Sequence, residues 1–163
     1  MTTYLSNYIK NNSNLLLIFL VLLLNTNSFG FYYLDLFLYI FLHVAILYQI
    51  LYLQNRFNYY YIFIIGFILD VSLINNFGPH LLSLIFLFFI YIRIKKFIYT
   101  NNLFIETLLN IITIFTVIII EKIIAYYLFG IIIYPDIILK TFIVLILFTY
   151  PIQYFLNLIN SNK

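Results

Sequence analysis

Residues 103–133 read LFIETLLNIITIFTVIIIEKIIAYYLFGIII and form the longest apolar stretch of the chain. A membrane-spanning helix needs about 20 predominantly apolar residues, so this stretch is long enough to cross a bilayer. It lacks the regular alternation of apolar and polar residues that is typical of strands in a membrane barrel. The stretch therefore predicts a transmembrane helix.

Apolar segments of the same kind lie on both sides of this stretch. The clear ones are Leu36–Leu53, Tyr59–Ile74, Leu81–Ile92 and Ile137–Leu158. A weaker one, Leu15–Leu24, follows Lys10 as the apolar core of a signal peptide would, but no small-x-small cleavage site comes after it. We therefore expect one all-α integral membrane domain over residues 1–163. It would be a polytopic bundle of six transmembrane helices near residues 13–31, 35–53, 59–75, 79–96, 103–129 and 137–158.

The composition excludes several classes of protein. Of the 163 residues, 66% are hydrophobic and 8% are charged, whereas a soluble domain carries about a quarter charged residues. An ordinary cytosolic enzyme and a disordered chain are both excluded. The net charge of +3 comes without a basic stretch that could follow a phosphate backbone, so we expect no nucleic-acid partner. The absence of cysteine rules out disulfides and thiolate metal sites.

The basic residues predict the orientation in the membrane. The connections around residues 25–35, 75–80 and 130–136 contain no Lys or Arg, and the alternate connections and the two termini carry six. Those six are Lys10, Arg56, Arg93, Lys95, Lys96 and Lys163. Because basic residues stay on the cytoplasmic side of a membrane, both termini are expected in the cytoplasm.

Asp70 is the most informative polar residue, because a carboxylate at membrane depth is costly unless it is paired or hydrated. Gly66 lies four residues earlier, on the same helical face, where a glycine lets another helix approach closely. Gly78 suits a turn and Pro79 suits the first turn of the next helix. Asp70 either braces this hairpin or contacts a ligand or partner directly. If it only braces the turn, Asp70→Asn should be mild.

Two histidines lie in the apolar segments. His80 begins the segment after the turn and could meet Asp70 across the hairpin, as a hydrogen-bond partner or as part of a proton relay or metal pair. One Asp and one His fall short of a full metal-ligand set. His43, in the middle of its segment, is expected to bond a neighbouring helix.

The quoted stretch contains three further charges. Glu106 suits the start of its helix, near Lys95 and Lys96. Glu121 lies deeper and needs a partner inside the bundle, a second subunit or a substrate. Adjacent helical residues point about 100° apart, so Glu121 and Lys122 are not expected to pair, and Lys122 is expected to extend outward. In the last segment, Asp136 and Lys140 are four residues apart and are expected to form a local pair.

No enzyme signature is present. The sequence offers no Ser-His-Asp set, no paired catalytic carboxylates on one face, no phosphate loop and no cluster of metal ligands. We therefore expect no catalytic residues, no metal and no cofactor.

Residues 59–96 resemble the rod shape-determining protein MreD family of bacterial membrane proteins. The resemblance rests on a Gly-x-x-x-Asp at a helix end, a glycine eight residues after the acid, and a Gly-x-His/Asn-x-Leu helix start. These positions are Gly66, Asp70, Gly78, His80 and Leu82, and the following helix ends in a basic cluster over residues 91–96. The chain departs from the family where it has Ile74 and Asn75 in the turn, and where it lacks a proline before the second helix.

The resemblance implies a non-enzymatic component of the cell-elongation machinery in the bacterial cytoplasmic (inner) membrane. Its direct partner would be an MreC-like protein. Through it the chain would be linked to MreB filaments, RodA and a class B penicillin-binding transpeptidase. The alternative is the substrate-binding membrane subunit of an energy-coupling-factor vitamin transporter, with Asp70, His80 and Glu121 as possible ligand contacts near the outer face. A scaffold of some other envelope complex is a third possibility.

Overall fold

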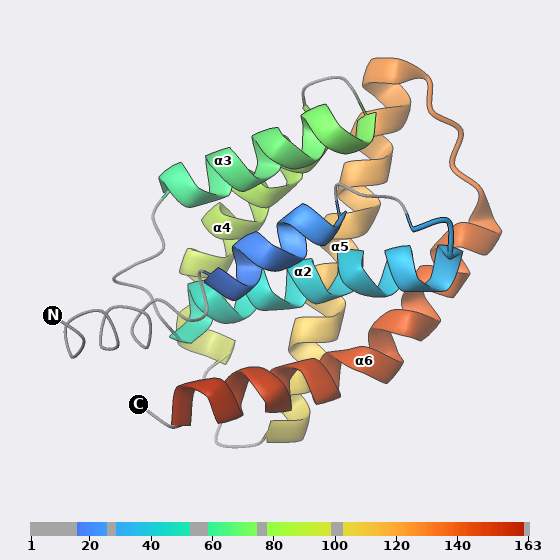
Figure 1. Cartoon of the computed structure of the whole chain (residues 1–163). Coiled ribbons are helices and arrows are strands. Elements are labelled where there is room, and N and C mark those ends of the chain that lie inside the picture. The colour runs from blue at the N-terminus through green and yellow to red at the C-terminus, as the bar shows by residue number, and fades with distance from the viewer. Residues whose placement is uncertain (1–15, 26–28, 53–58, 75–77, 99–102, 162–163) are drawn as a thin grey trace, which may run out of the picture.

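The computed structural model describes residues 16–25, 29–52, 59–74, 78–98 and 103–161, and every regular element in these ranges is a helix (Figure 1). The first helix covers Leu16–Asn25. The elements after it are α2 (Tyr32–Tyr52), α3 (Tyr59–Leu69), α4 (Pro79–Ile98), α5 (Leu103–Phe129) and α6 (Pro135–Ser161), and a short π-helix, η1 (Asp70–Ile74), continues α3. The expected all-α class is therefore confirmed.

Three of these helices contain segments long and apolar enough to cross a membrane. The segments are Tyr32–Ile50 of α2, Phe104–Phe129 of α5 and Pro135–Ile159 of α6. Leu16–Asn25, Tyr59–Leu73 and Pro79–Ile90 are apolar but shorter. By length and composition, the described residues thus contain three membrane-spanning candidates.

The region between the first two helices differs from the expectation. A helix was expected over residues 13–31, but residues 29–31 are not helical, and Gly30 takes a left-handed conformation with φ of 73°. The next helix starts at Tyr32 rather than near residue 35, because the Leu34 and Asp35 amides both donate to the Phe31 carbonyl, at 2.9 and 3.0 Å. Asp35 in turn accepts the Phe29 amide at 3.1 Å. Local hydrogen bonding of the turn therefore sets the start of α2.

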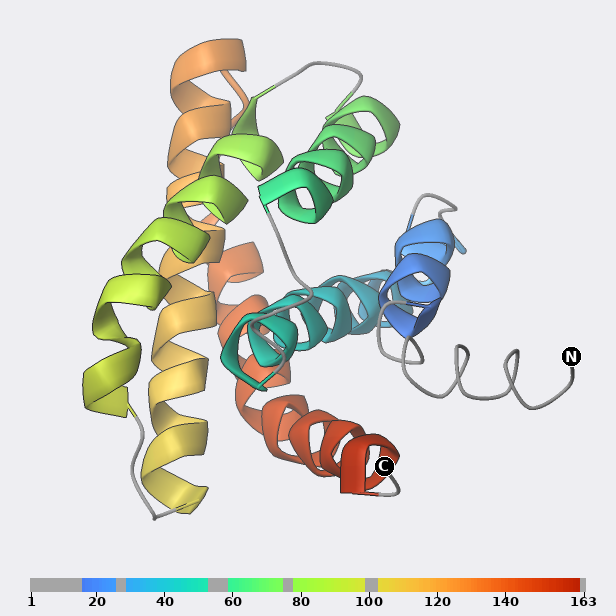
Figure 2. The ribbon, with the colours of Figure 1, turned by 90° about the vertical axis from the view of Figure 1, so that its left-hand side faces the viewer.

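The helices do not all run in one direction. α4 and α5 lie side by side, whereas α2 runs across α5 (Figures 1 and 2). α3 packs on α4, and α6 packs on both α2 and α5. Fully buried aliphatic side chains fill the space between them, among them Ile40, Leu47, Ile62, Leu84 and Ile114.

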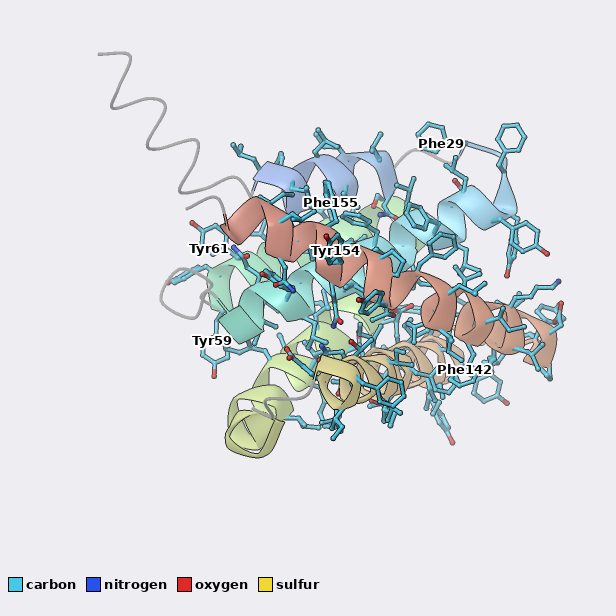
Figure 3. All side chains as sticks on the ribbon, turned by 90° about the horizontal axis from the view of Figure 1, so that it is seen from below. Phe29, Tyr59, Tyr61, Phe142, Tyr154 and Phe155 are labelled. Carbon is cyan, nitrogen blue, oxygen red and sulfur yellow. The ribbon has the colours of Figure 1, made fainter. Side chains whose placement is uncertain are left out.

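The outer surface is largely apolar. Aromatic side chains project from it, including Phe29, Tyr59, Tyr154 and Phe155 (Figure 3), and these four are exposed. Soluble proteins rarely expose apolar surface on this scale, because it promotes association in water. A surface of this kind suits a protein surrounded by lipid.

Candidate functional site

Asp70 connects the end of α3 to the start of α4. Its carboxylate is fully buried and accepts four hydrogen bonds. Oδ2 accepts the Gly78 amide at 2.9 Å and the Leu81 amide at 3.2 Å, while Oδ1 accepts the His80 amide at 2.9 Å. His80 Nδ1 also lies 2.9 Å from Oδ1. The acid thus satisfies amides at the N-terminus of α4, where a negative charge is favoured.

The two glycines of this junction have separate structural reasons. A Cβ on Gly66 would lie 2.6 Å from the Cα of Leu81, so only glycine permits α3 and α4 to approach this closely. Gly78 has φ of 142°, which side-chain-bearing residues rarely adopt. Pro79 begins α4, as expected from the sequence. The close approach expected at Gly66 is confirmed.

A short π-helix begins at Asp70. π-Helices, whose hydrogen bonds join residues five apart, are rare and recur at functional sites. Here η1 begins at Asp70, and Ser72 bonds back to the Ile68 carbonyl at 2.6 Å. Asn75 and Asn76, which follow η1 in the sequence, lie outside the described residues.

The carboxylate geometry changes the expectation for Asp70→Asn. Each of the two carboxylate oxygens accepts two hydrogen bonds from N–H groups. An asparagine would turn its NH₂ group toward at least one backbone N–H donor, whichever way the amide is oriented. The substitution is therefore not conservative here, even if Asp70 acts only within the hairpin.

Leu82 is the motif position outside this junction. Its amide donates to the Gly78 carbonyl at 2.8 Å, but its side chain is 46% exposed. Four of the five motif positions, Gly66, Asp70, Gly78 and His80, are thus joined in the junction, and Leu82 faces outward.

Glu121 of α5 is the second centre of the site, and only 1% of it is exposed. The Tyr39 hydroxyl of α2 donates to Oε2. Oε1 lies 3.2 Å from Lys122 Nζ and 3.4 Å from His80 Nε2. His43 Nε2 lies 3.8 Å from Oε2. One carboxylate therefore faces polar groups from α2, α4 and its own helix, which confirms that it finds partners inside the bundle.

Two expectations about these neighbours were wrong in part. Lys122 does pair with Glu121, because both side chains are long and flexible enough to bend toward each other despite the angle between them. His43 bonds the Tyr39 carbonyl of its own helix through Nδ1, at 2.9 Å, and approaches α5 only through Nε2. Its ring also lies against the Tyr39 ring, with centroids 4.4 Å apart.

His80 joins the two acids. Its Nδ1 faces Asp70 and its Nε2 faces Glu121, so an acid–imidazole–acid row runs from the α3–α4 junction to α5. Lys122 Nζ lies 3.2 Å from Glu121 Oε1, so the buried acid at this end of the row has a cationic partner. A buried charge is tolerated in a low-dielectric interior when it is paired and hydrogen-bonded.

The same row limits the chemistry available. Among the described residues, no group of three or more His, Cys, Asp or Glu side chains is placed to hold a metal ion. Deeper in the bundle, Gln49 Oε1 and both amide atoms of Asn110 are buried without a hydrogen-bond partner in the described structure. The arrangement is therefore suited to holding helices together and to contacting a ligand at its edge.

A cavity opens beside the row. It has a volume of about 380 Å³, and its polar wall includes Asp35, Tyr39, His80 and Lys122. Leu73, Ala125 and several isoleucines supply the apolar wall. Asp70 and Glu121 do not line this cavity and lie behind His80 and Lys122. Of the three residues named as possible ligand contacts, only His80 reaches it.

Tyr39 was missed by sequence reasoning, although one signal was present. It lies four residues before His43, so the two share a helical face, and both lie against Glu121. The local pair between Asp136 and Lys140 is confirmed at 3.3 Å. Glu106 is partly buried, and the side chains of Lys95 and Lys96, its expected neighbours, lie outside the described set.

No protein-family model, curated protein or solved structure matches the chain.

Proposed function

We propose that this chain is a non-enzymatic membrane component of the bacterial cell-elongation complex, as its resemblance to the MreD family implies. One observation carries the proposal. Four of the five positions on which the resemblance rests lie in one hydrogen-bonded and closely packed junction between α3 and α4. Each of these four positions thus has a structural role in the same junction, which supports the resemblance.

The remaining motif position supplies the contact with a partner. Leu82 is exposed, so its side chain is available to a partner. In a membrane protein whose surface is nearly all apolar helix, partners are recognised by lateral packing of helix faces. The MreC-like protein would pack on the Leu82 face of α4 and link the chain indirectly to MreB filaments, RodA and the transpeptidase.

Co-purification with the MreC-like protein tests this contact. Leu82→Ala should leave membrane abundance unchanged and lower the amount of co-purified partner. Leu108→Ala is the matched control, because Leu108 of α5 is 44% exposed and outside the motif. Equal co-purification by both variants and the wild type would contradict a contact at Leu82.

Depletion in a rod-shaped host tests the function itself. Cells should become round, and uptake of vitamins should be unaffected. Wild-type protein supplied in trans should restore the rod shape, whereas Gly66→Leu should not, because its side chain would force α3 away from α4. Normal cell shape upon depletion would contradict the proposal.

In the proposed topology, the chain crosses the bacterial inner membrane six times and both termini lie in the cytoplasm. Support comes from the six basic residues, all on one predicted side. Reporter fusions after Asn76 and Asp136 should report the periplasm, and fusions after Asn58 and Thr100 the cytoplasm. A cytoplasmic signal after Asn76 would rule out this topology.

One observation favours the alternative of a vitamin-transporter subunit. That function needs a ligand pocket, and the cavity of about 380 Å³ beside His80 and Lys122 lies in the size range of small-molecule sites. The depletion experiment separates the two functions, because a vitamin requirement with normal cell shape would favour transport.

A further inference from the structure

Two cavities share a wall where α5 ends and α6 begins. The larger has a volume of about 380 Å³ and the smaller about 160 Å³. Ile118, Lys122, Ile131, Ile137 and Thr141 line both. Lys122 is the charged residue in this shared set.

The two cavities differ in chemistry. The smaller is bounded mainly by isoleucine side chains, with Phe115 and Tyr134. The larger has hydroxyl, imidazole and ammonium groups from Tyr39, His80 and Lys122. Together they offer a polar compartment and an apolar compartment that meet at one lysine.

Hydrogen-bonding capacity at this lysine exceeds what the cluster uses. Asp70 already accepts four hydrogen bonds, and Glu121 faces Tyr39, Lys122 and His80. An ammonium group has three N–H donors, and the structure gives Lys122 a single hydrogen bond, to Glu121, with 41% of its side chain exposed. The remaining N–H groups can reach an acceptor in the cavity.

Asp35 is the acid that lines the larger cavity, and it is bonded to the turn before α2. Asp35 lies in the first turn of α2, where its Oδ1 accepts the Phe29 amide. Lys122 instead extends over the Tyr39 ring, 5.7 Å from its centroid. A cation beside an apolar wall and facing a cavity favours an anionic group that carries a hydrocarbon part.

We propose that the joined cavities bind an anionic amphiphile, with its phosphate or carboxylate head on Lys122 and its hydrocarbon part against the isoleucine wall. Lys122 is seven residues before Phe129, the end of α5, which is about 10 Å along the helix axis. The head would thus bind within the protein, about two turns before the end of α5, rather than among the surrounding lipid headgroups. This inference does not rest on the proposed cell-elongation role.

Lipid binding to the purified full-length chain tests the proposal. Delipidated protein in a neutral detergent would be titrated with phosphatidylglycerol, phosphatidylcholine, oleate or inorganic phosphate, and bound molecules counted by native mass spectrometry. One phosphatidylglycerol should bind at least about tenfold more tightly than phosphatidylcholine, because the choline ammonium would lie beside the Lys122 ammonium and be repelled by it, whereas the phosphatidylglycerol head carries a net negative charge. If oleate binds at the same site, the site accepts a carboxylate head. If oleate does not bind, the site requires a phosphate head. Inorganic phosphate that binds as tightly as the lipid would overturn the need for a hydrocarbon part.

Lys122→Met should remove the preference for phosphatidylglycerol. Lys140→Met is the matched control, because Lys140 is a lysine of similar exposure, 43%, that does not line either cavity. A preference that both variants lose equally would identify ordinary surrounding lipid and overturn the proposal.

A second variant leaves the charges in place. Ala125 is buried and lines the larger cavity only, so Ala125→Leu should fill space and weaken lipid binding while Glu121 keeps its partners. Its thermal unfolding without lipid shows whether the fold is intact. Wild-type binding by a folded Ala125→Leu variant would overturn the assignment of the head to this cavity.

Discussion

Gly66→Ala is the sharpest test of the α3–α4 junction, because two opposing effects decide the sign of the result. In the interior of an exposed helix, alanine is more favourable than glycine by about 1 kcal/mol. At Gly66 the added Cβ would lie 2.6 Å from the Leu81 Cα, whereas ordinary contact begins at 3.4 Å. The neighbouring atom is backbone, so α4 itself has to move away.

The size of the effect follows from that movement. Overpacking a close contact costs about 1–3 kcal/mol. A displacement of α4 would also lengthen the Leu81 amide to Asp70 bond, which is already 3.2 Å long, and a bond to a charged group is worth about 1.5–3 kcal/mol. After subtraction of the helix preference for alanine, the free energy of unfolding should fall by about 1.5–5 kcal/mol.

Reversible unfolding in mixed detergent micelles, followed by circular dichroism, measures this change. Gly30→Ala is the control, because Gly30 has φ of 73° with no atom near its missing Cβ, so only the left-handed backbone penalty of about 1–2 kcal/mol applies. A Gly66→Ala variant that is more stable than the wild type would refute the close approach of α3 and α4.

Three further substitutions test the buried polar groups in the same unfolding assay. Asp70→Asn should destabilise the protein nearly as much as Asp70→Leu, since in either orientation its NH₂ group would face a backbone N–H donor; a change below about 0.5 kcal/mol would contradict the four-bond geometry. Tyr39→Phe removes a donor to the buried Glu121 and should cost about 1–3 kcal/mol, a loss that Tyr39→Phe should not add to a Glu121→Leu background, where no acceptor remains. Asn110→Leu should leave stability unchanged or raise it, because the amide is buried without a partner in the described structure; a loss above about 1 kcal/mol would point to a hydrogen bond at Asn110.

Hydropathy was sufficient to predict the helices, because the apolar segments are long and the breaks between them are short. The start of α2 was not predicted, since it depends on the turn around Gly30, where Asp35 accepts the Phe29 amide. A periodic pattern contains no information about such a turn.

The candidate site could be predicted only where its residues are near in sequence. Asp70 and His80 are ten residues apart across one turn, so their contact was predictable. Tyr39 and Glu121 are separated by 82 residues, and only the packing of α2 against α5 brings them together. The Glu121–Lys122 pair was missed because helical angles describe the Cβ direction and not the reach of a flexible side chain.

The partners of Glu121 have a consequence for how the chain enters the membrane during synthesis. Translation proceeds from the N-terminus, so Tyr39, His43 and His80 have all left the ribosome before Glu121 does. An acid inserted alone at the centre of a bilayer costs about 2.5–3.5 kcal/mol on insertion scales. α5 brings its own counter-ion in Lys122 and meets polar partners for its acid, among them the Tyr39 hydroxyl donor, that are already in place. A circularly permuted chain that begins with α5 should therefore insert less efficiently than the natural order, although its final contacts would be the same.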